Sequence, residues 1–121
     1  MKTPFASLLL LVPAVALAAT TAPQTRVEID HLFSYLKSSG CEFNRNGSWY
    51  GADEAVNHLH KKYEYLLDKG YVGTTEDFVK RAATESSISG KPYQVRCKGA
   101  APMPSGDWFR AELAKYRAAR H

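Results

Sequence analysis

Apolar residues recur at helical spacing in two long stretches of the chain. In residues 23–39 they fall at positions i, i+3, i+4 and i+7, and residues 52–69 continue this pattern for longer. The spacing places apolar side chains on one face of an α-helix. Gly40 and Gly70 follow the two stretches and favour helix ends, because glycine adopts the left-handed C-terminal conformation without strain. Two amphipathic helices are therefore predicted, with stripes formed by Ile29, Leu32, Phe33 and Leu36, and by Ala52, Ala55, Val56, Leu59, Tyr63, Leu66 and Leu67.

Two shorter helices are predicted further along the chain. Thr74 and Ser105 are each followed by apolar residues at helical spacing, and their hydroxyl groups can cap the first turn of a helix. Residues 86–92 and 98–104 contain glycine and proline and are predicted to be loops. The inward-facing residues are Phe78, Val79, Ala82 and Ala83 in the third helix, and Trp108, Phe109, Leu113 and Tyr116 in the fourth.

Two short segments, residues 41–45 and 93–97, alternate with the period of a β-strand. Asn46-Gly47 follows the first segment and is the dipeptide that most readily forms a tight turn. Residues 48–50 then either return as a further strand or lead directly into the next helix. The chain is thus predicted to be a small α+β domain, with about four helices packed on a minimal antiparallel sheet of two or three strands.

The N-terminus has the pattern of a secretory signal peptide. Lys2 precedes an apolar run at residues 8–17, and Ala16-Leu17-Ala18 matches the small-x-small site that a signal peptidase cleaves. The apolar run is too short to span a membrane. We therefore expect residues 1–18 to be removed and residues 19–121 to form one exported domain without a membrane span.

The sequence contains two cysteines, Cys41 and Cys97. In an exported chain the expected outcome is one structural disulfide. The alternative, a catalytic or metal-binding thiol, would need a C-x-x-C partner or a histidine at ligand spacing, which neither cysteine has. If the two strands run antiparallel with the cysteines opposite one another, the predicted register also pairs Phe43 with Val95 and Arg45 with Tyr93.

The formal net charge is +4 over 121 residues, with acidic and basic residues interspersed. Export makes nucleic acid an unexpected partner, and it leaves lipid headgroups, cell-wall polymers and acidic proteins as candidate anionic partners. No cofactor is expected. The charge alone does not predict an oligomeric state.

His58 is the histidine with the most interesting surroundings in the sequence. Glu54 and His58 share one side of the second helix, whereas His60 points elsewhere, so two ligands are present where a zinc site needs three or four. No metal site is expected. His58 also borders the apolar stripe, with Lys62 one turn later, so it is either a half-buried structural residue or a general base.

The loop at residues 86–93 gathers hydroxyl groups, a glycine and a lysine near the expected position of Arg45. Its backbone amides could form an anion-binding concavity. The alternative is a solvated loop whose serines satisfy their own backbone. With His58 as an outlying member, the candidate ligand-binding residues are Arg45, Asn46, His58, Ser86, Ser87, Ser89 and Lys91.

Several of these segments together resemble a known family. The combined pattern, which spans roughly residues 26 to 118, is similar to the YfeK-like family of short, exported proteobacterial proteins of unknown function. The resemblance implies a periplasmic protein of a Gram-negative bacterium, and it implies no activity, cofactor or catalytic residue. The segments are residues 43–47, Glu54-Ala55, His58-Leu59, Lys62, residues 75–78 and residues 86–95.

The leading expectation is a non-enzymatic module that binds an envelope component or a protein, because the sequence contains no complete catalytic set. One alternative is a small hydrolase or transferase that acts on an envelope polymer with His58 as its base. A further alternative rests on residues 89–93, which resemble the Ser-Gly-x-x-Tyr loop of periplasmic lysozyme inhibitors. That resemblance implies a loop inserted into the lysozyme cleft, although those inhibitors consist mainly of β-strands.

Overall fold

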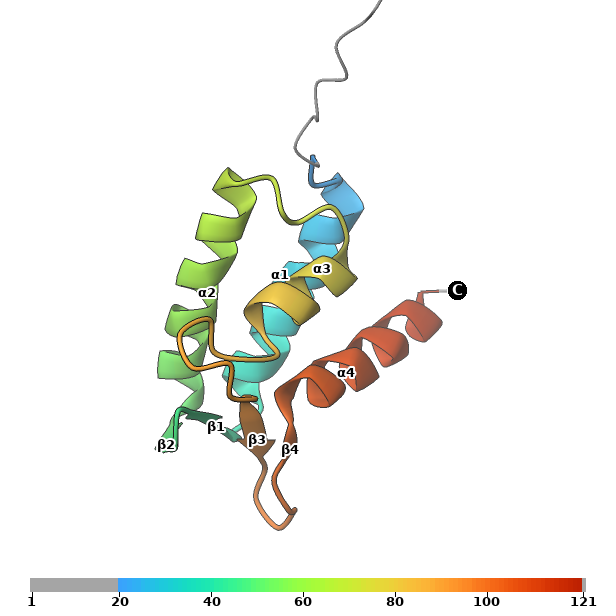
Figure 1. The fold of residues 1–121 in the computed structure, drawn as a ribbon. Coiled ribbons are helices and arrows are strands. Elements are labelled where there is room, and N and C mark those ends of the chain that lie inside the picture. Colours follow the sequence, from blue (N-terminus) through green and yellow to red (C-terminus); the bar gives the residue numbers. More distant parts are fainter. Residues whose placement is uncertain (1–19, 121) are drawn as a thin grey trace, which may run out of the picture.

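The computed structural model describes residues 20–120, so the predicted signal peptide at residues 1–18 lies outside the described residues. Within that range the structure contains four helices and one small sheet, which lies at one end of the helices, and this confirms the predicted α+β class (Figure 1). No helix in this part of the chain has the length and apolar character needed to cross a bilayer. In chain order the elements are α1 (Pro23–Ser38), β1 (Glu42–Arg45), β2 (Ser48–Tyr50), α2 (Ala52–Asp68), α3 (Thr75–Ala82), β3 (Gln94–Arg96), β4 (Met103–Pro104) and α4 (Ser105–Ala119).

The sheet is antiparallel, with the strand order β2-β1-β3-β4. Phe43 lies opposite Val95, as the predicted register requires. Residues 48–50, whose role the sequence left open, form β2 and pair with β1 across the Asn46-Gly47 turn. The sheet also gains β4 from a segment predicted to be loop. Two residues are too few for an alternating pattern to be visible in the sequence.

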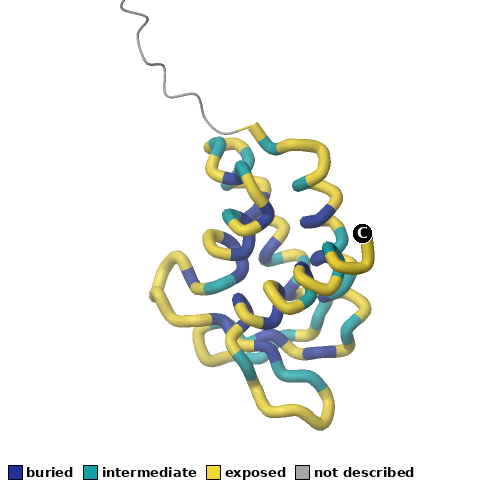
Figure 2. Tube along the Cα trace, turned by 90° about the vertical axis from the view of Figure 1, so that its right-hand side faces the viewer, coloured by how far each residue is buried: buried dark blue, intermediate teal, exposed yellow. Residues whose placement is uncertain are grey.

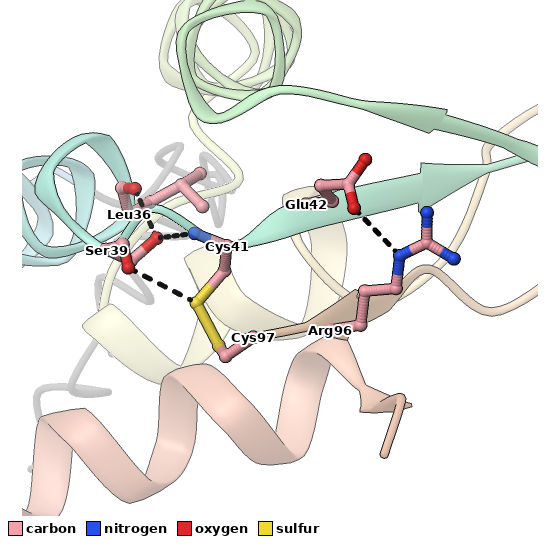
Figure 3. Close-up of a disulfide and its surroundings, with 6 residues drawn as sticks. All are labelled: Leu36, Ser39, Cys41, Glu42, Arg96 and Cys97. Atoms are coloured by element: carbon pink, nitrogen blue, oxygen red, sulfur yellow. Dashed lines mark hydrogen bonds and ion pairs between the residues drawn. A yellow bond between two sulfur atoms is a disulfide. The ribbon is translucent and has the colours of Figure 1, made fainter. Parts of the chain in front are cut away.

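The Cys41–Cys97 disulfide is present and joins the start of β1 to the end of β3 (Figure 3). The hydroxyl group of Ser39 stabilises the turn before β1, because it donates to the carbonyl of Leu36 at 2.7 Å and accepts from the amide of Cys41 at 3.0 Å. Beside the disulfide, Glu42 and Arg96 form an ion pair across the two strands. The bridge therefore closes the end of the β1–β3 pairing that lies far from the Asn46-Gly47 turn.

The helices bury their apolar stripes against one another and against the sheet, and the buried positions lie on their inner sides (Figure 2). Both long stripes predicted from the sequence contribute to this core. Thr74 forms a capping box with Asp77, which confirms its predicted role at the start of α3. The largest fully buried apolar side chains are Phe43, Phe78, Phe109, Ile29, Leu32, Leu36, Leu59, Val72, Val79 and Val95.

The prediction that Ser105 caps the last helix is wrong. Ser105 is the first residue of α4, the N-cap position belongs to Pro104, and no side chain caps the helix. The backbone amide of Ser105 donates to the carbonyl of Tyr93 at 2.9 Å, which extends the pairing between β3 and β4. This bond draws Ser105 inward, and its buried hydroxyl oxygen has no hydrogen-bond partner among the described residues. Sheet pairing therefore overrides the local capping preference.

A buried carboxylate connects three helices. Glu28 of α1 accepts two hydrogen bonds from Arg117 of α4, at 2.8 and 2.9 Å, and one from Thr75 of α3. Arg117 also pairs with Glu76 at 2.7 Å. The hydrogen bonds from Arg117 are the largest cause of the low pKa of Glu28, about 2, and burial opposes them. The charged form of Glu28 therefore favours the folded state.

We expect removal of the disulfide to destabilise the protein strongly. The bridge spans 56 positions, and for such a loop the chain-entropy model gives about 4 kcal/mol, or a fall in melting temperature of roughly 20 °C. Thermal unfolding of the Cys41→Ala/Cys97→Ala variant, followed by circular dichroism, tests this. Reductant should lower the melting temperature of the original protein and leave that of the variant unchanged. Equal melting temperatures for the two proteins would contradict the expectation.

We expect Glu28→Gln to lower the free energy of unfolding at pH 7 by about 2 kcal/mol. The full shift corresponds to about 3 kcal/mol, and it is reduced here because Arg117 is 42% exposed. Since the pKa of Glu28 is lower in the folded than in the unfolded chain, this stabilisation is complete above about pH 4.5 and is lost as the pH falls toward 2.

Urea unfolding at pH 7 and pH 3 measures both effects of Glu28→Gln. Glu42→Gln is the matched control, since it removes an exposed pair whose contribution is below about 1 kcal/mol. An unfolding free energy of Glu28→Gln that falls between pH 7 and pH 3 as steeply as that of the original protein would count against the assignment.

Candidate functional site

Three segments that are distant in sequence meet at the hydroxyl group of Tyr93. Tyr93 directly precedes β3, and its ring is buried against Phe43. His58 and Lys62 lie one turn apart on α2, and His58 Nε2 and Lys62 Nζ are each 3.1 Å from the Tyr93 oxygen. Arg45, the last residue of β1, contacts His58 Nδ1 at 2.5 Å. The pairing of β1 with β3 and the packing of α2 on this sheet bring the four side chains together.

The hydrogen bonds determine the tautomer of His58. A guanidinium group can only donate, so Nδ1 of His58 must accept from Arg45. The neutral imidazole then carries its proton on Nε2 and donates it to the Tyr93 oxygen. The Lys62 ammonium donates to the same oxygen. The phenol therefore accepts two hydrogen bonds, and its own proton has no acceptor among residues 20–120.

The electrostatics of this cluster disfavour additional positive charge. Burial lowers the pKa of His58 to about 4, and the charges of Arg45, Lys62 and Lys61 contribute to this shift. Burial also lowers the pKa of Lys62 to about 8; Glu85 opposes this shift and Arg45 adds to it. At pH 7 the imidazole is therefore neutral, while Arg45 and Lys62 are charged.

A pocket of about 210 Å³ opens beside this cluster. A second pocket of similar volume lies on the other side of the Arg45–His58 pair, between the sheet and α2, where Tyr50 and Glu54 contribute to its lining. The Arg45–His58 pair thus separates two concavities. The first pocket is lined by Arg45, Asn46, His58, Lys62, Ser86, Ser87, Ile88 and Tyr93.

Asn46 connects the β1–β2 turn to the loop at residues 86–92. Its amide group donates to Ser86 Oγ at 3.4 Å, and its carbonyl oxygen accepts from Ser89 Oγ. Ser86 is buried, and its Oγ also accepts from the amides of Ile88 and Ser89. These two amides are therefore occupied within the loop and do not form the suggested anion-binding concavity. The serines largely satisfy their own backbone, as the alternative predicted.

The structure brings together most of the predicted site residues. Arg45, Asn46, His58, Ser86 and Ser87 share the pocket. Ser89 reaches it only through its bond to Asn46, and exposed Lys91 is not among the lining residues.

Three further members of this pocket were not among the predicted site residues, namely Lys62, Ile88 and Tyr93. Signals for Lys62 and Tyr93 were present. Lys62 follows His58 by one helical turn, and Tyr93 stands opposite Arg45 in the predicted register. Ile88 gave no signal, because an isolated apolar residue in a polar loop has no periodicity.

The geometry gives no support to the two rival functions. His58 makes its hydrogen bonds to Arg45 and Tyr93, and no serine hydroxyl among residues 20–120 bonds to it, as a nucleophile activated by His58 would. Tyr93 is only 1% exposed, so it is not available for insertion into a lysozyme cleft. Between residues 20 and 120 no group of three or more His, Cys, Asp or Glu residues is placed to hold a metal ion.

We expect Arg45→Gln and Lys62→Met each to raise the pKa of His58 from about 4. Each change removes a positive charge near the imidazole, so the protonated form becomes less costly. The pKa should remain below the 6.5 typical of histidine, because burial makes the largest contribution to its lowering and is unchanged in both variants. An NMR titration of the imidazole resonances measures this, with His60 as internal reference. Unchanged His58 titration curves in both variants would show that these charges do not affect the pKa of the imidazole.

Comparison with known proteins agrees with the resemblance to YfeK-like proteins. A family model described as a family of unknown function, DUF5329, matches residues 23–117. The uncharacterised protein YfeK of Salmonella typhimurium is 41% identical over 51 residues, which cover 42% of this chain and 41% of that protein. No solved structure matches this chain. Since the family model covers most of its length, the chain belongs to the family of unknown function DUF5329.

Proposed function

We propose that this protein is a non-enzymatic periplasmic binding module that holds an anionic group of an envelope component or protein in the pocket between Arg45 and Lys62. In this proposal residues 1–18 are removed on export, and residues 19–121 act as one domain. The disulfide supports an extracytoplasmic location, because such bridges persist in oxidising compartments. The site residues in this proposal are those of the pocket, with Ser89 and Lys91 at its margin.

The observation that carries the proposal is a pair of half-buried cations without an acidic partner. Among residues 20–120, neither Arg45 nor Lys62 forms an ion pair with Asp or Glu. Lys62 instead donates to the Tyr93 oxygen and to the Glu85 carbonyl at 2.9 Å, and Arg45 donates to neutral His58. Buried charges are normally paired, since desolvation is costly. Glu85 acts on Lys62 without forming an ion pair with it, and an anion in the pocket would supply a direct partner for both cations.

Several hydrogen-bond donors line the pocket. Arg45 has further N–H groups beyond the one that faces His58, and the Tyr93 proton has no acceptor among residues 20–120. The hydroxyl group of Ser87 lies in the same lining. Carboxylate and phosphate oxygens accept several such bonds at once, and bonds to a charged donor are the stronger ones. The pocket therefore has the donors to hold one anionic group.

We expect inorganic phosphate to bind the purified protein saturably at pH 7 and constant ionic strength. NMR titration should shift the signals of Arg45, Lys62 and Ser87. Arg45→Gln and Lys62→Met should each weaken binding by about tenfold, because each removes a charged hydrogen bond.

Lys115→Gln is the matched control for this titration. It removes an exposed cation from α4, which lies across the molecule from α2 (Figure 1). This variant should bind phosphate like the original protein. Shifts that do not saturate, or that persist unchanged in both pocket variants, would rule out this site.

A further inference from the structure

The anion pocket continues into a longer groove along α2 and α3. A concavity of about 370 Å³ shares His58, Lys62 and Ser87 with the pocket and extends to Leu66 and Arg81. A further concavity of about 410 Å³ shares Leu66, Arg81 and Ser87 with it and reaches Tyr71 and Lys80. Because neighbouring concavities share walls, they form one path, which we call the basic groove.

The basic groove carries a strong excess of positive charge. Together with the pocket it is lined by five cations, which are Arg45, Lys61, Lys62, Lys80 and Arg81, and by a single carboxylate, that of Glu85. None of the five forms an ion pair with an acidic side chain of the described residues. The groove therefore has complementarity to a ligand with several negative charges.

Apolar groups accompany these charges. Tyr65 is 60% exposed and Tyr71 49% exposed, and Ile88, beside the pocket, is 96% exposed. Large apolar side chains gathered on one face often mark an interaction site. A ligand that contacts the whole groove thus needs apolar as well as negative groups.

We propose that the basic groove binds an extended acidic segment of another polypeptide. One carboxylate of the segment occupies the pocket beside Arg45 and Lys62, further carboxylates pair with Arg81 and Lys80, and apolar side chains between them pack on Leu66. In an extended chain successive side chains alternate in direction, so acidic and apolar residues can face different walls of a groove. This inference rests on the proposed function, since the same pocket holds the first carboxylate.

Two other kinds of polyanion fit the groove less well. Sugar polymers stack on the faces of exposed aromatic rings, but Lys69 lies over Tyr65 at 5.7 Å from the ring centre and Arg81 lies over Tyr71 at 5.4 Å. An anionic membrane presents a broad surface, whereas these cations line concavities. A polypeptide segment is narrow enough to enter a groove and carries both kinds of side chain.

A short fluorescein-labelled peptide of alternating Glu and Val tests the proposal, with the same peptide bearing Gln in place of Glu as its control. Fluorescence anisotropy should show saturable binding of the acidic peptide and at least tenfold weaker binding of the Gln peptide. Lys80→Gln/Arg81→Gln should weaken binding of the acidic peptide by about tenfold or more, since two charged contacts are lost. Lys115→Gln should not change it.

Several outcomes would overturn the inference. The first is equal binding of the two peptides. The second is binding of the acidic peptide that Lys80→Gln/Arg81→Gln leaves unchanged. The third is Arg81-dependent binding to phosphatidylglycerol vesicles or to polygalacturonate that is tighter than binding to the peptide. The phosphate titration distinguishes failure of the groove from failure of the pocket. If phosphate still saturates the pocket of the Lys80→Gln/Arg81→Gln variant, and this variant binds the acidic peptide as tightly as the original protein does, only the proposed role of the groove is refuted. If phosphate does not bind the original protein, the proposed function itself fails.

Discussion

The Cys41–Cys97 disulfide connects β1 and β3 at one end of their pairing. It thereby fixes the strand register, which determines the face of each side chain as far as the other end. Cys41, Phe43 and Arg45 share one face of β1, because successive residues of a strand point to opposite sides. Phe43 enters the core opposite Val95, and Arg45 emerges at the far end beside α2 and Tyr93. A pairing shifted by one residue would turn Arg45 to the other face. The strand register that directs Phe43 into the core therefore also positions the Arg45 guanidinium group.

Tyr93 couples the core to the site. Its ring packs on Phe43, with the ring centres 5.0 Å apart, while its hydroxyl oxygen accepts hydrogen bonds from His58 and Lys62. The ring is thus held by apolar packing at the position where its polar end meets two donors. Two half-buried cations without a carboxylate destabilise a fold. The pair between buried Glu28 and Arg117, in contrast, stabilises the place where α1, α3 and α4 meet.

The parts of the fold that could be predicted are those set by local pattern. The helical stripe containing Leu32 and the capping residue Thr74 act over one or two turns, and the two cysteines specify one long-range contact. Strand β4 could not be predicted, and neither could the start of α4, because the amide of Ser105 bonds to Tyr93. That bond exists only once the sheet has formed.

The candidate site shows the same division between local and long-range information. The sequence predicted that Arg45 lies near the loop at residues 86–93, because the register of the two strands places them together. It did not predict that Ser86 would be buried and would bond Asn46, because Asn46 lies forty positions away. Nor did the sequence show that Lys62 would meet the Tyr93 hydroxyl, which depends on how α2 packs on the sheet. The chemistry of the pocket is therefore a product of packing.

The loop that carries Ile88 is well suited to presenting an apolar side chain to a partner. Ser86 Oγ accepts from the amides of Ile88 and Ser89, and Asn46 bonds both serines from the neighbouring turn. The backbone amide of Ser86 also donates to the carbonyl of Lys91 at 3.0 Å, which closes the base of the loop. Ile88 is thus 96% exposed on a backbone held by several hydrogen bonds. Such a loop loses little conformational entropy on binding, so its apolar contact adds to the attraction of the neighbouring cations.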